Sequence, residues 1–229
     1  VGGMKHAISL FDHSGVMLEP WNEAGYRCWA IDIKHKEGVS ERDDGIMLVG
    51  ADLMTNLESN SDYNYMLEVI KNRIGFVSAF PPCTDLAVSG ARWFKGKGLR
   101  ALADSVHMFA TATEFCEWSE APYCIENPVS TISTYWRKPD HSFHPYEFCG
   151  IAPEDNYTKK TCLWVGNGFV MPTPNVDQSL GDPDNRIHWM APSPERASLR
   201  SQTPRGFARA VYEANKGEVS NEISNVRVC

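Results

Sequence analysis

Short apolar runs alternate with helical patterns along this chain, and this alternation restricts the possible folds more than any other feature. Strands are expected over residues 6–11, 28–33, 46–53, 74–80 and 122–125. Helices are expected over residues 17–25, 62–73 and 101–119. The helix over residues 101–119 is predicted from one apolar stripe at helical spacing, formed by Leu102, Val106, Phe109, Thr113 and Cys116. Strands alternating with helices predict an α/β fold: a Rossmann-like, doubly wound and mostly parallel sheet with helices on both faces.

The segment that follows this alternation has a different character. Residues 151–200 are rich in proline and contain one convincing strand pattern, over residues 161–165. A final helix is predicted to begin at Thr203-Pro204, where a cap residue precedes proline at the first helical position. We therefore expect a main domain over 4–150, a small loop-rich insertion over 151–200, a helix over 201–216 that packs back on the main domain, and a tail over 217–229.

Charge and cysteine content limit the class of protein. The chain has 29 acidic and 22 basic residues, a net charge of −7, which argues mildly against polyanionic partners. A basic surface is nevertheless possible where arginines gather, and these lie at residues 186, 196, 200, 205 and 209. The seven cysteines are scattered without any Cys-x-x-Cys pair, so neither a disulfide framework nor a metal site is expected. With no apolar run long enough to cross a bilayer, the sequence predicts a cytoplasmic protein without membrane contact.

Polar or reactive residues follow the predicted strands at the points where the strands end. They are Phe11-Asp12, Asp32, Asp52, Cys83 and Glu126-Asn127. Ligands of open parallel sheets bind at the carboxyl ends of the strands, so these side chains are expected to line one cleft. A reactive thiol beside a nucleotide-like ligand is the chemistry that this set indicates. Taken alone, Cys83 also fits a buried structural cysteine, and each aspartate also fits a loop cap.

Several local sequences in this order are similar to those of a known family. Phe80-Pro81-Pro82-Cys83, Ile125-Glu126-Asn127-Pro128, the opening Leu10-Phe11-Asp12-His13-Ser14-Gly15 and the last helix resemble motifs of the DNA (cytosine-5) methyltransferases, in the short form found in phages. The resemblance covers most of residues 6–216. It implies the fold of S-adenosylmethionine-dependent methyltransferases, with catalysis and cofactor binding in the main domain and target recognition in the reduced insertion. It also implies the cytoplasm of a bacterial or phage-infected cell.

The resemblance implies a covalent mechanism. Cys83 would add as a thiolate to carbon 6 of cytosine, which makes carbon 5 able to take a methyl group from S-adenosylmethionine. Glu126 would hydrogen-bond or protonate ring nitrogen 3, and Asn127 would fix its loop through backbone hydrogen bonds. The family carries Gln-x-Arg-x-Arg before a late strand, whereas this chain has Lys159-Lys160 there. One of these two lysines is expected near the substrate, without the planar fork of arginine.

The resemblance also assigns residues to the cofactor. Phe11 would stack on the adenine of S-adenosylmethionine, and the turn from Asp12 to Gly15 would allow the backbone to approach its methionine end. Asp32 fits the acidic residue that binds ribose hydroxyls, and Asp52 fits the acceptor of the adenine amino group. Pro81 is placed on the cofactor side of the Cys83 loop. The opening turn has fewer glycines than is usual in the family.

The expected partner is duplex DNA, from which the target cytosine must be extruded because carbon 6 cannot be reached inside the base stack. The candidate DNA contacts are Arg92, Lys95, Lys97, Arg100, Arg186 and Arg200. Residues 89–99 are predicted to form a mobile loop over the extruded base. The recognition region is short, so we expect limited sequence preference or a separate specificity partner.

Two alternative functions are compatible with the sequence. The same thiolate chemistry could act on RNA cytosine, on a pyrimidine nucleotide, or with a modified one-carbon group. Alternatively, the chain could be a catalytically silent relative that binds nucleic acid. The short recognition region, the lysine pair and the glycine-poor turn favour these alternatives, whereas the presence of both Cys83 and Glu126 favours the methyltransferase.

Overall fold

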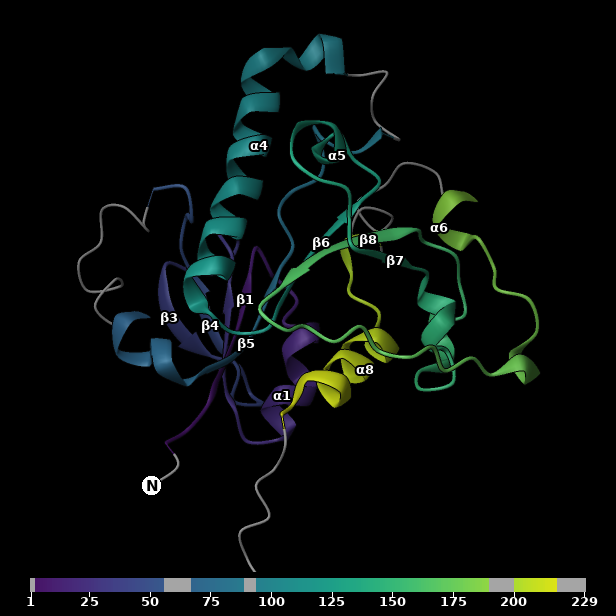
Figure 1. Ribbon diagram of the computed structural model, residues 1–229, viewed down its shortest axis with the longest axis horizontal. Helices are drawn as coiled ribbons and strands as arrows, with labels where there is room; N and C mark the ends of the chain where they lie inside the picture. The colour runs from purple at the N-terminus through teal and green to yellow at the C-terminus, as the bar shows by residue number, and fades with distance from the viewer. Residues whose placement is uncertain (1–2, 56–66, 89–93, 190–199, 218–229) are drawn as a thin grey trace, which may run out of the picture.

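A computed structural model describes residues 3–55, 67–88, 94–189 and 200–217, and these contain an eight-stranded sheet (Figure 1). Across the sheet the strands follow the order β3-β4-β2-β1-β5-β6-β8-β7. Their bounds are β1 His6–Leu10, β2 Arg27–Ile31, β3 Gly38–Glu41, β4 Met47–Gly50, β5 Ile74–Ala79, β6 Tyr123–Pro128, β7 His141–Phe143 and β8 Thr161–Gly166.

Five central strands are parallel, and three strands near the edges run against a neighbour. Strands β4, β2, β1, β5 and β6 pair in parallel, whereas β3, β8 and β7 make antiparallel pairs with β4, β6 and β8. From β1 the chain builds outward through β2 and β4 and then returns to β5 and β6 on the other side. This is the doubly wound, mostly parallel α/β sheet that the sequence predicts, and it places a topological switch point between β1 and β5.

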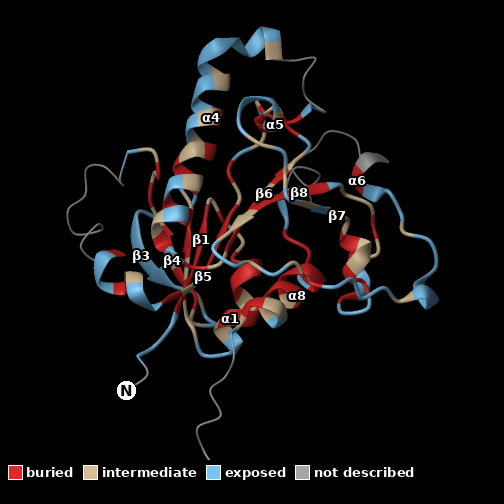
Figure 2. Cartoon of the chain, in the orientation of Figure 1, coloured by how far each residue is buried: buried red, intermediate tan, exposed pale blue. Residues whose placement is uncertain are grey.

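Helices cover both faces of the sheet. One face packs on α4 (Phe94–Ser119), where Phe109 and Cys116 join Ile8, Leu10 and Trp164 in one core cluster. The other face packs on α1 (Glu19–Glu23) and α8 (Arg205–Asn215), where Trp21 and Phe207 lie with Phe76 and Phe143 in a second cluster. Ala7 and Ile8 belong to different clusters because successive side chains of a strand point to opposite faces. Figure 2 shows the buried residues along the sheet and on the inner sides of these helices.

The remaining described elements are short. They are α5 (Ile132–Tyr135), α6 (Arg186–Trp189) and the 3-10 turns Val16–Leu18, Lys71–Arg73, Pro145–Phe148, Pro153–Asp155 and Gln178–Leu180. The segment after residue 150 is mostly loop, as the sequence predicts, but its strand β8 belongs to the same sheet as β1 to β6.

Helix α4 differs from its predicted form. It begins at Phe94, whereas the sequence predicts a start at Ala101, seven residues later. Phe94 to Leu99 is therefore part of a helix and not of the predicted loop. Gly98 interrupts it with φ 81° and ψ 170°, a conformation that glycine adopts without steric cost. The rest of the predicted loop, 89–93, lies outside the described residues, as do residues 62–66 of the helix predicted over 62–73. The described remainder of that helix is α-helical over 67–70 and a 3-10 turn over Lys71–Arg73.

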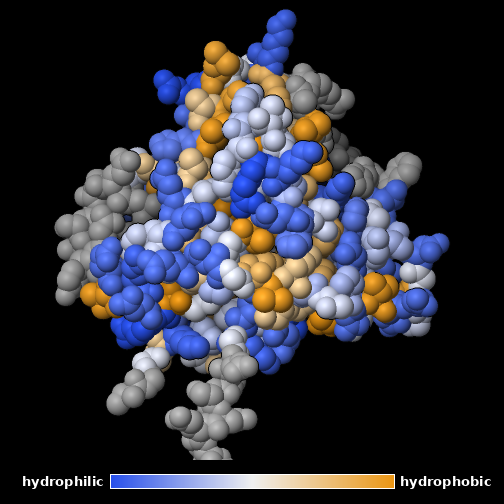
Figure 3. Space-filling view, in the orientation of Figure 1, coloured by the Kyte–Doolittle hydropathy of each residue, from blue (hydrophilic) through white to orange (hydrophobic). Residues whose placement is uncertain are grey.

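The N-terminal part of α4 projects beyond the sheet, and its surface is apolar in places. Figure 1 shows this end of the helix standing clear of the strands, and Figure 3 shows hydrophobic atoms gathered there. Leu99 is 84% exposed.

Candidate active site

Strand ends bring the predicted residues to one edge of the sheet. Asp52 follows β4, Asp32 follows β2, Phe11 follows β1, Cys83 follows β5, and Glu126 lies in the last half of β6. Since these five strands are parallel neighbours, their carboxyl ends face the same side. The three residues after β4, β2 and β1 lie on one side of the switch point, and Cys83 and Glu126 lie on the other. The edge therefore has two halves, which we call the cofactor half and the thiol half.

Cys83 lies in a tight turn after β5. Its carbonyl accepts hydrogen bonds from the Leu86 and Ala87 N–H groups at 3.0 and 2.8 Å. The residue is half-buried, whereas the other described cysteines, at residues 28, 116, 124, 149 and 162, are buried. Among the thiols that the structure describes, Cys83 is thus the accessible one, which a nucleophile requires.

Burial raises the pKa of the Cys83 thiol, and the Glu126 carboxylate raises it further. Lys159 and Arg200 oppose this and favour the thiolate. Burial also raises the pKa of Glu126, and Lys159 again acts in the opposite direction. The thiol and the carboxyl are therefore close enough to repel each other when both are ionised, so the pair favours a single negative charge.

Lys159 and Lys160 occupy different positions. Lys159 is half-buried, and its Nζ donates to the Gln202 carbonyl at 3.3 Å, beside the segment that leads into α8. Its charge acts on both Cys83 and Glu126, whereas exposed Lys160 acts on Cys162. Of the two lysines that the sequence could not separate, Lys159 faces the thiol half of the edge.

Asn127 connects the Cys83 loop to β6 through a hydrogen bond. Its Nδ2 donates to the Pro81 carbonyl at 2.9 Å, and the side chain is buried. Pro81 therefore takes part in the loop through its backbone, on the thiol half. Further along, Val88 N–H donates to the Val129 carbonyl and Thr131 N–H to the Leu86 carbonyl, both at 3.0 Å. The segments that follow β5 and β6 are thus joined side by side.

Unpaired polar atoms gather at this junction. Within the described part of the chain, Asn127 Oδ1, Ser130 Oγ and Thr131 Oγ1 are buried and have no hydrogen-bond partner. A buried polar atom without a partner costs about 1–3 kcal/mol. Such atoms are rare in cores and are more common at sites that receive a ligand or an ordered water.

The cofactor half is built around the turn after β1. Phe11 has φ 54°, an uncommon left-handed conformation for an aromatic residue, and such strain is concentrated at functional sites. Asp12 is 4% exposed, and its Oδ1 accepts from Ser14 N–H, Ser14 Oγ and Gly15 N–H at 2.9, 2.9 and 2.8 Å. Its Oδ2 accepts from Ser9 Oγ at 2.7 Å. Both oxygens of the Asp12 carboxylate therefore accept hydrogen bonds inside the turn and fix its shape.

The two other aspartates each have one carboxylate oxygen engaged locally. Asp32 Oδ1 accepts from Lys34 N–H at 2.7 Å, and Asp52 Oδ1 accepts from Met54 N–H at 3.0 Å. Next to Asp32, Ile33 is 67% exposed, an apolar side chain that the sequence pattern does not single out. The sequence alone gives little reason to select Ile33 as a site residue, because a single apolar residue after a strand is common in loops.

The candidate DNA-binding residues divide into two groups. Lys95, Arg100 and Arg200 are exposed and form no ion pair with any residue that the structure describes. Lys97 and Arg186 are paired: Lys97 Nζ lies 2.6 Å from Asp85 Oδ1, and Arg186 binds both carboxylate oxygens of Asp184. Arg92 lies outside the described residues.

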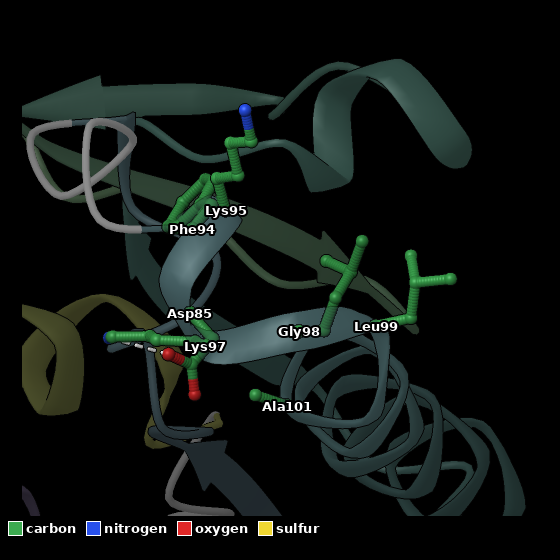
Figure 4. Close-up of a pocket in the computed structure, with 8 residues that line it drawn as sticks. Asp85, Phe94, Lys95, Lys97, Gly98, Leu99 and Ala101 are labelled. Atoms are coloured by element: carbon green, nitrogen blue, oxygen red, sulfur yellow. Dashed lines mark hydrogen bonds and ion pairs between the residues drawn. The ribbon is translucent and has the colours of Figure 1, made fainter.

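A pocket of about 360 Å³ lies where α4 meets the Cys83 loop (Figure 4). Lys97 also donates to the Thr84 carbonyl at 3.2 Å, so it ties the first turn of α4 to that loop. In Figure 4, Lys95 extends away from the Lys97–Asp85 pair. The pocket is lined by Asp85, Phe94, Lys95, Lys97, Gly98, Leu99, Ala101 and Leu102.

Comparison with known proteins gives a likeness in structure only. No family model matches the sequence, and no curated protein matches it. Among 23 similar chains of solved structures is one described as a "putative DNA modification methyltransferase", encoded within a prophage of E. coli. It has a TM-score of 0.47 and 11% sequence identity, over 82% of this chain and 56% of that chain. This chain thus spans little more than half of that protein's length.

None of the helices in the described ranges is both long enough and apolar enough to span a membrane.

Proposed function

We propose that this protein transfers a methyl group from S-adenosylmethionine to carbon 5 of a cytosine extruded from duplex DNA. The observation that supports this most is the meeting of a half-buried thiol, a carboxyl with raised pKa and a lysine at neighbouring strand ends. Cys83, Glu126 and Lys159 supply these groups from the loop after β5, from β6 and from the segment before β8. A nucleophile beside a carboxyl whose pKa is raised by burial suits addition to an electron-poor ring.

The residues of the cofactor half fit S-adenosylmethionine by their chemistry. The Phe11 ring and the exposed Ile33 side chain are apolar groups that suit a flat ring. Asp32 and Asp52 each have a second carboxylate oxygen that forms no hydrogen bond with the described residues and suits a hydroxyl or amino donor. Bound there, S-adenosylmethionine would supply an activated methyl group on a sulfonium ion. Phe11, Asp32 and Asp52 would hold it, and the Asp12–Gly15 turn would receive its amino acid end.

Cys83 and Glu126 divide the acid and base work. The thiol loses its proton to water, and Sγ forms a bond to carbon 6 as the carbon 5–carbon 6 double bond breaks and its electrons move toward carbon 5 and nitrogen 3. Glu126 holds a proton at nitrogen 3, which neutralises the charge that develops there. A protonated Glu126 no longer repels the thiolate, so the state in which Cys83 attacks is also the state in which Glu126 can donate. The electron-rich carbon 5 would take the methyl group that S-adenosylmethionine supplies. Carbon 5 then gives its proton to water, the electrons of that C–H bond form the carbon 5–carbon 6 double bond, and the Sγ–carbon 6 bond breaks to return the thiolate. Nitrogen 3 returns its proton to Glu126.

Lys159 and Asn127 support Cys83 and Glu126, one through its charge and the other through a hydrogen bond. The ammonium group of Lys159 favours the thiolate and opposes the rise in the pKa of Cys83 that burial and Glu126 cause. Asn127 holds the Pro81 carbonyl, so the Cys83 turn keeps its place relative to β6. Removing either residue is expected to reduce the rate of addition without removing the nucleophile.

The test is analysis of the product nucleoside. The protein is incubated with DNA of mixed sequence and S-adenosylmethionine whose methyl group carries deuterium, and the DNA is then digested to nucleosides for mass spectrometry. We expect labelled 5-methyldeoxycytidine from wild type and none from Cys83→Ser with an unchanged melting temperature. Labelled N4-methyldeoxycytidine or N6-methyldeoxyadenosine would contradict the proposal, because neither product needs a thiol adduct at carbon 6.

A further inference from the structure

Residues 11–15, which join β1 to the Val16–Leu18 3-10 turn, form a hydrogen bond with a residue distant in sequence. Arg42, which follows β3, donates from Nη1 to the Ser14 carbonyl at 2.7 Å. Its Nε and Nη2 donate to the two carboxylate oxygens of Asp44 at 2.8 and 2.7 Å. One guanidinium thus joins the β3–β4 connection to the turn that the proposed function assigns to the cofactor.

The contact between Arg42 and the turn is close. Gly15 has φ +67°, and a side-chain carbon added there would lie 3.1 Å from Arg42 Nη1. Glycine therefore serves two purposes at this position: it permits the left-handed backbone, and it leaves room for the guanidinium. Because Asp12 holds the inner side of the same turn, the Ser14–Gly15 backbone is fixed from two directions.

The geometry of arginine suits this task. Its planar fork allows Nη1 to reach the turn while Nε and Nη2 stay on Asp44, and Glu19 lies 3.6 Å from Nη2. The two carboxylates keep the side chain in place and compensate its charge. Lysine presents all of its donors from a single nitrogen, so it could not keep a two-point contact with Asp44 while a separate nitrogen reaches the Ser14 carbonyl.

We propose that Arg42 is a positioning residue for the binding of S-adenosylmethionine, since with Asp12 it fixes by side-chain hydrogen bonds a turn that contains few glycines. The inference rests on the proposed function, because it concerns the ligand of that same turn. Arg42 is not expected to touch the cofactor or the reacting atoms. Its effect is to hold the Ser14–Gly15 backbone in the conformation that binds.

Two measurements on the full chain test this inference. Titration calorimetry gives the dissociation constant for S-adenosylmethionine, and hydrogen exchange gives the protection of the peptide covering residues 11–18. Arg42→Met should bind S-adenosylmethionine about ten-fold more weakly, and its Ser14 and Gly15 amides should exchange about ten-fold faster, as expected for loss of a charge-assisted hydrogen bond. Arg42→Lys should behave nearly as poorly as Arg42→Met.

The matched control is Arg209→Met, which removes an arginine of α8 that pairs with Glu23 of α1 and forms no hydrogen bond with residues 11–18 in the described part of the chain. It should leave both measurements unchanged, with a melting temperature like that of Arg42→Met. Unchanged affinity and exchange in Arg42→Met would overturn the inference and leave the proposed function standing. Failure of the wild type to bind S-adenosylmethionine would overturn both, and hydrogen exchange would then report only whether Arg42 orders the turn.

Discussion

At the scale of single residues, the account depends on the electrostatic coupling between Cys83 and its neighbours. The Glu126 carboxylate raises the pKa of the Cys83 thiol, and Lys159 lowers it. Glu126→Gln should therefore increase the rate of thiol alkylation at about pH 8, because the thiolate fraction rises as the pKa falls. Lys159→Met should decrease this rate.

The measurement for this prediction is the rate of iodoacetamide labelling at Cys83, followed by mass spectrometry between about pH 7 and 9. Lys160→Met is the matched control, since the neighbouring lysine is exposed and acts on Cys162. All variants also carry a replacement of Cys229, which lies outside the described residues, so that this thiol does not contribute to the labelling. Equal rates in Glu126→Gln and wild type would contradict the coupling between the thiol and the carboxyl.

A second residue-scale prediction concerns Asp155, which caps α8. Its Oδ2 accepts the Gly206 N–H at 2.7 Å, and burial raises its pKa from 3.8 to about 6. Since the folded-state pKa is raised, the contribution of Asp155 to stability is full below about pH 3.8 and is lost as the pH rises through about 6.

Asp155→Asn keeps an oxygen acceptor for Gly206 but does not ionise. The free energy of unfolding of wild type, measured by urea titration, should therefore fall relative to that of Asp155→Asn between about pH 4 and 7. The difference between the two proteins should stay constant below this window. A constant difference throughout the window would show that the Asp155 pKa is not raised by folding.

At the scale of elements, the last helix is part of the main core. Phe207 of α8 is 1% exposed and stacks on Phe143 of β7, with ring centroids 3.8 Å apart. Phe207→Ala should lower the free energy of unfolding by about 3–5 kcal/mol, because it removes a buried ring and leaves a cavity. The control is Val176→Ala, at a residue that is 48% exposed, which should change this free energy by less than about 0.5 kcal/mol. A small effect of Phe207→Ala would mean that α8 is not packed in this core.

Elements with a strong apolar pattern could be predicted from sequence, and the others could not. Strand β5 was predicted because it is a short, nearly continuous apolar run, and the body of α4 because its apolar residues recur at helical spacing. Strand β3 was not, because all four of its residues, Gly38–Glu41, are exposed and carry no pattern. Strand β7 has three residues and is too short to show one.

The same distinction applies to the candidate site. Its strand-end residues followed from the sheet topology, since a residue that ends a parallel strand must lie at one edge. The position of Lys159 relative to Lys160 depended on how the chain enters β8, which the sequence does not fix. Arg42 had no local signal, because its partner Ser14 lies in another element and the hydrogen bond between them exists only in the folded chain.

At the scale of the whole molecule, the proposed function requires a protein with a net charge of −7 to bind DNA through a local basic surface. Lys95 and Arg100, both unpaired within the described ranges, lie near the projecting end of α4, whereas Arg186 is paired with Asp184. Replacing Lys95 and Arg100 with glutamine should weaken DNA binding and reduce the slope of log affinity against log salt by about one for each phosphate that the variant no longer binds.

Arg186→Gln is the comparison for this prediction. Its charge is already compensated, so it should change the salt slope little in electrophoretic retardation at several salt concentrations. The opposite ranking, with a large effect of Arg186 and none of Lys95 and Arg100, would place the DNA on the loop-rich region and away from α4.

The most direct test of the central claim is mass spectrometry of the denatured protein after incubation with S-adenosylmethionine and duplex DNA containing 5-fluorocytosine. Fluorine cannot leave carbon 5 as a proton would, so the thiol adduct is trapped. The account predicts a covalent adduct on Cys83 that carries one added methyl group, and no adduct in Cys83→Ser. If S-adenosylmethionine binds but no adduct forms on DNA of varied sequence, Cys83 is not a nucleophile toward DNA cytosine and the proposed function is wrong.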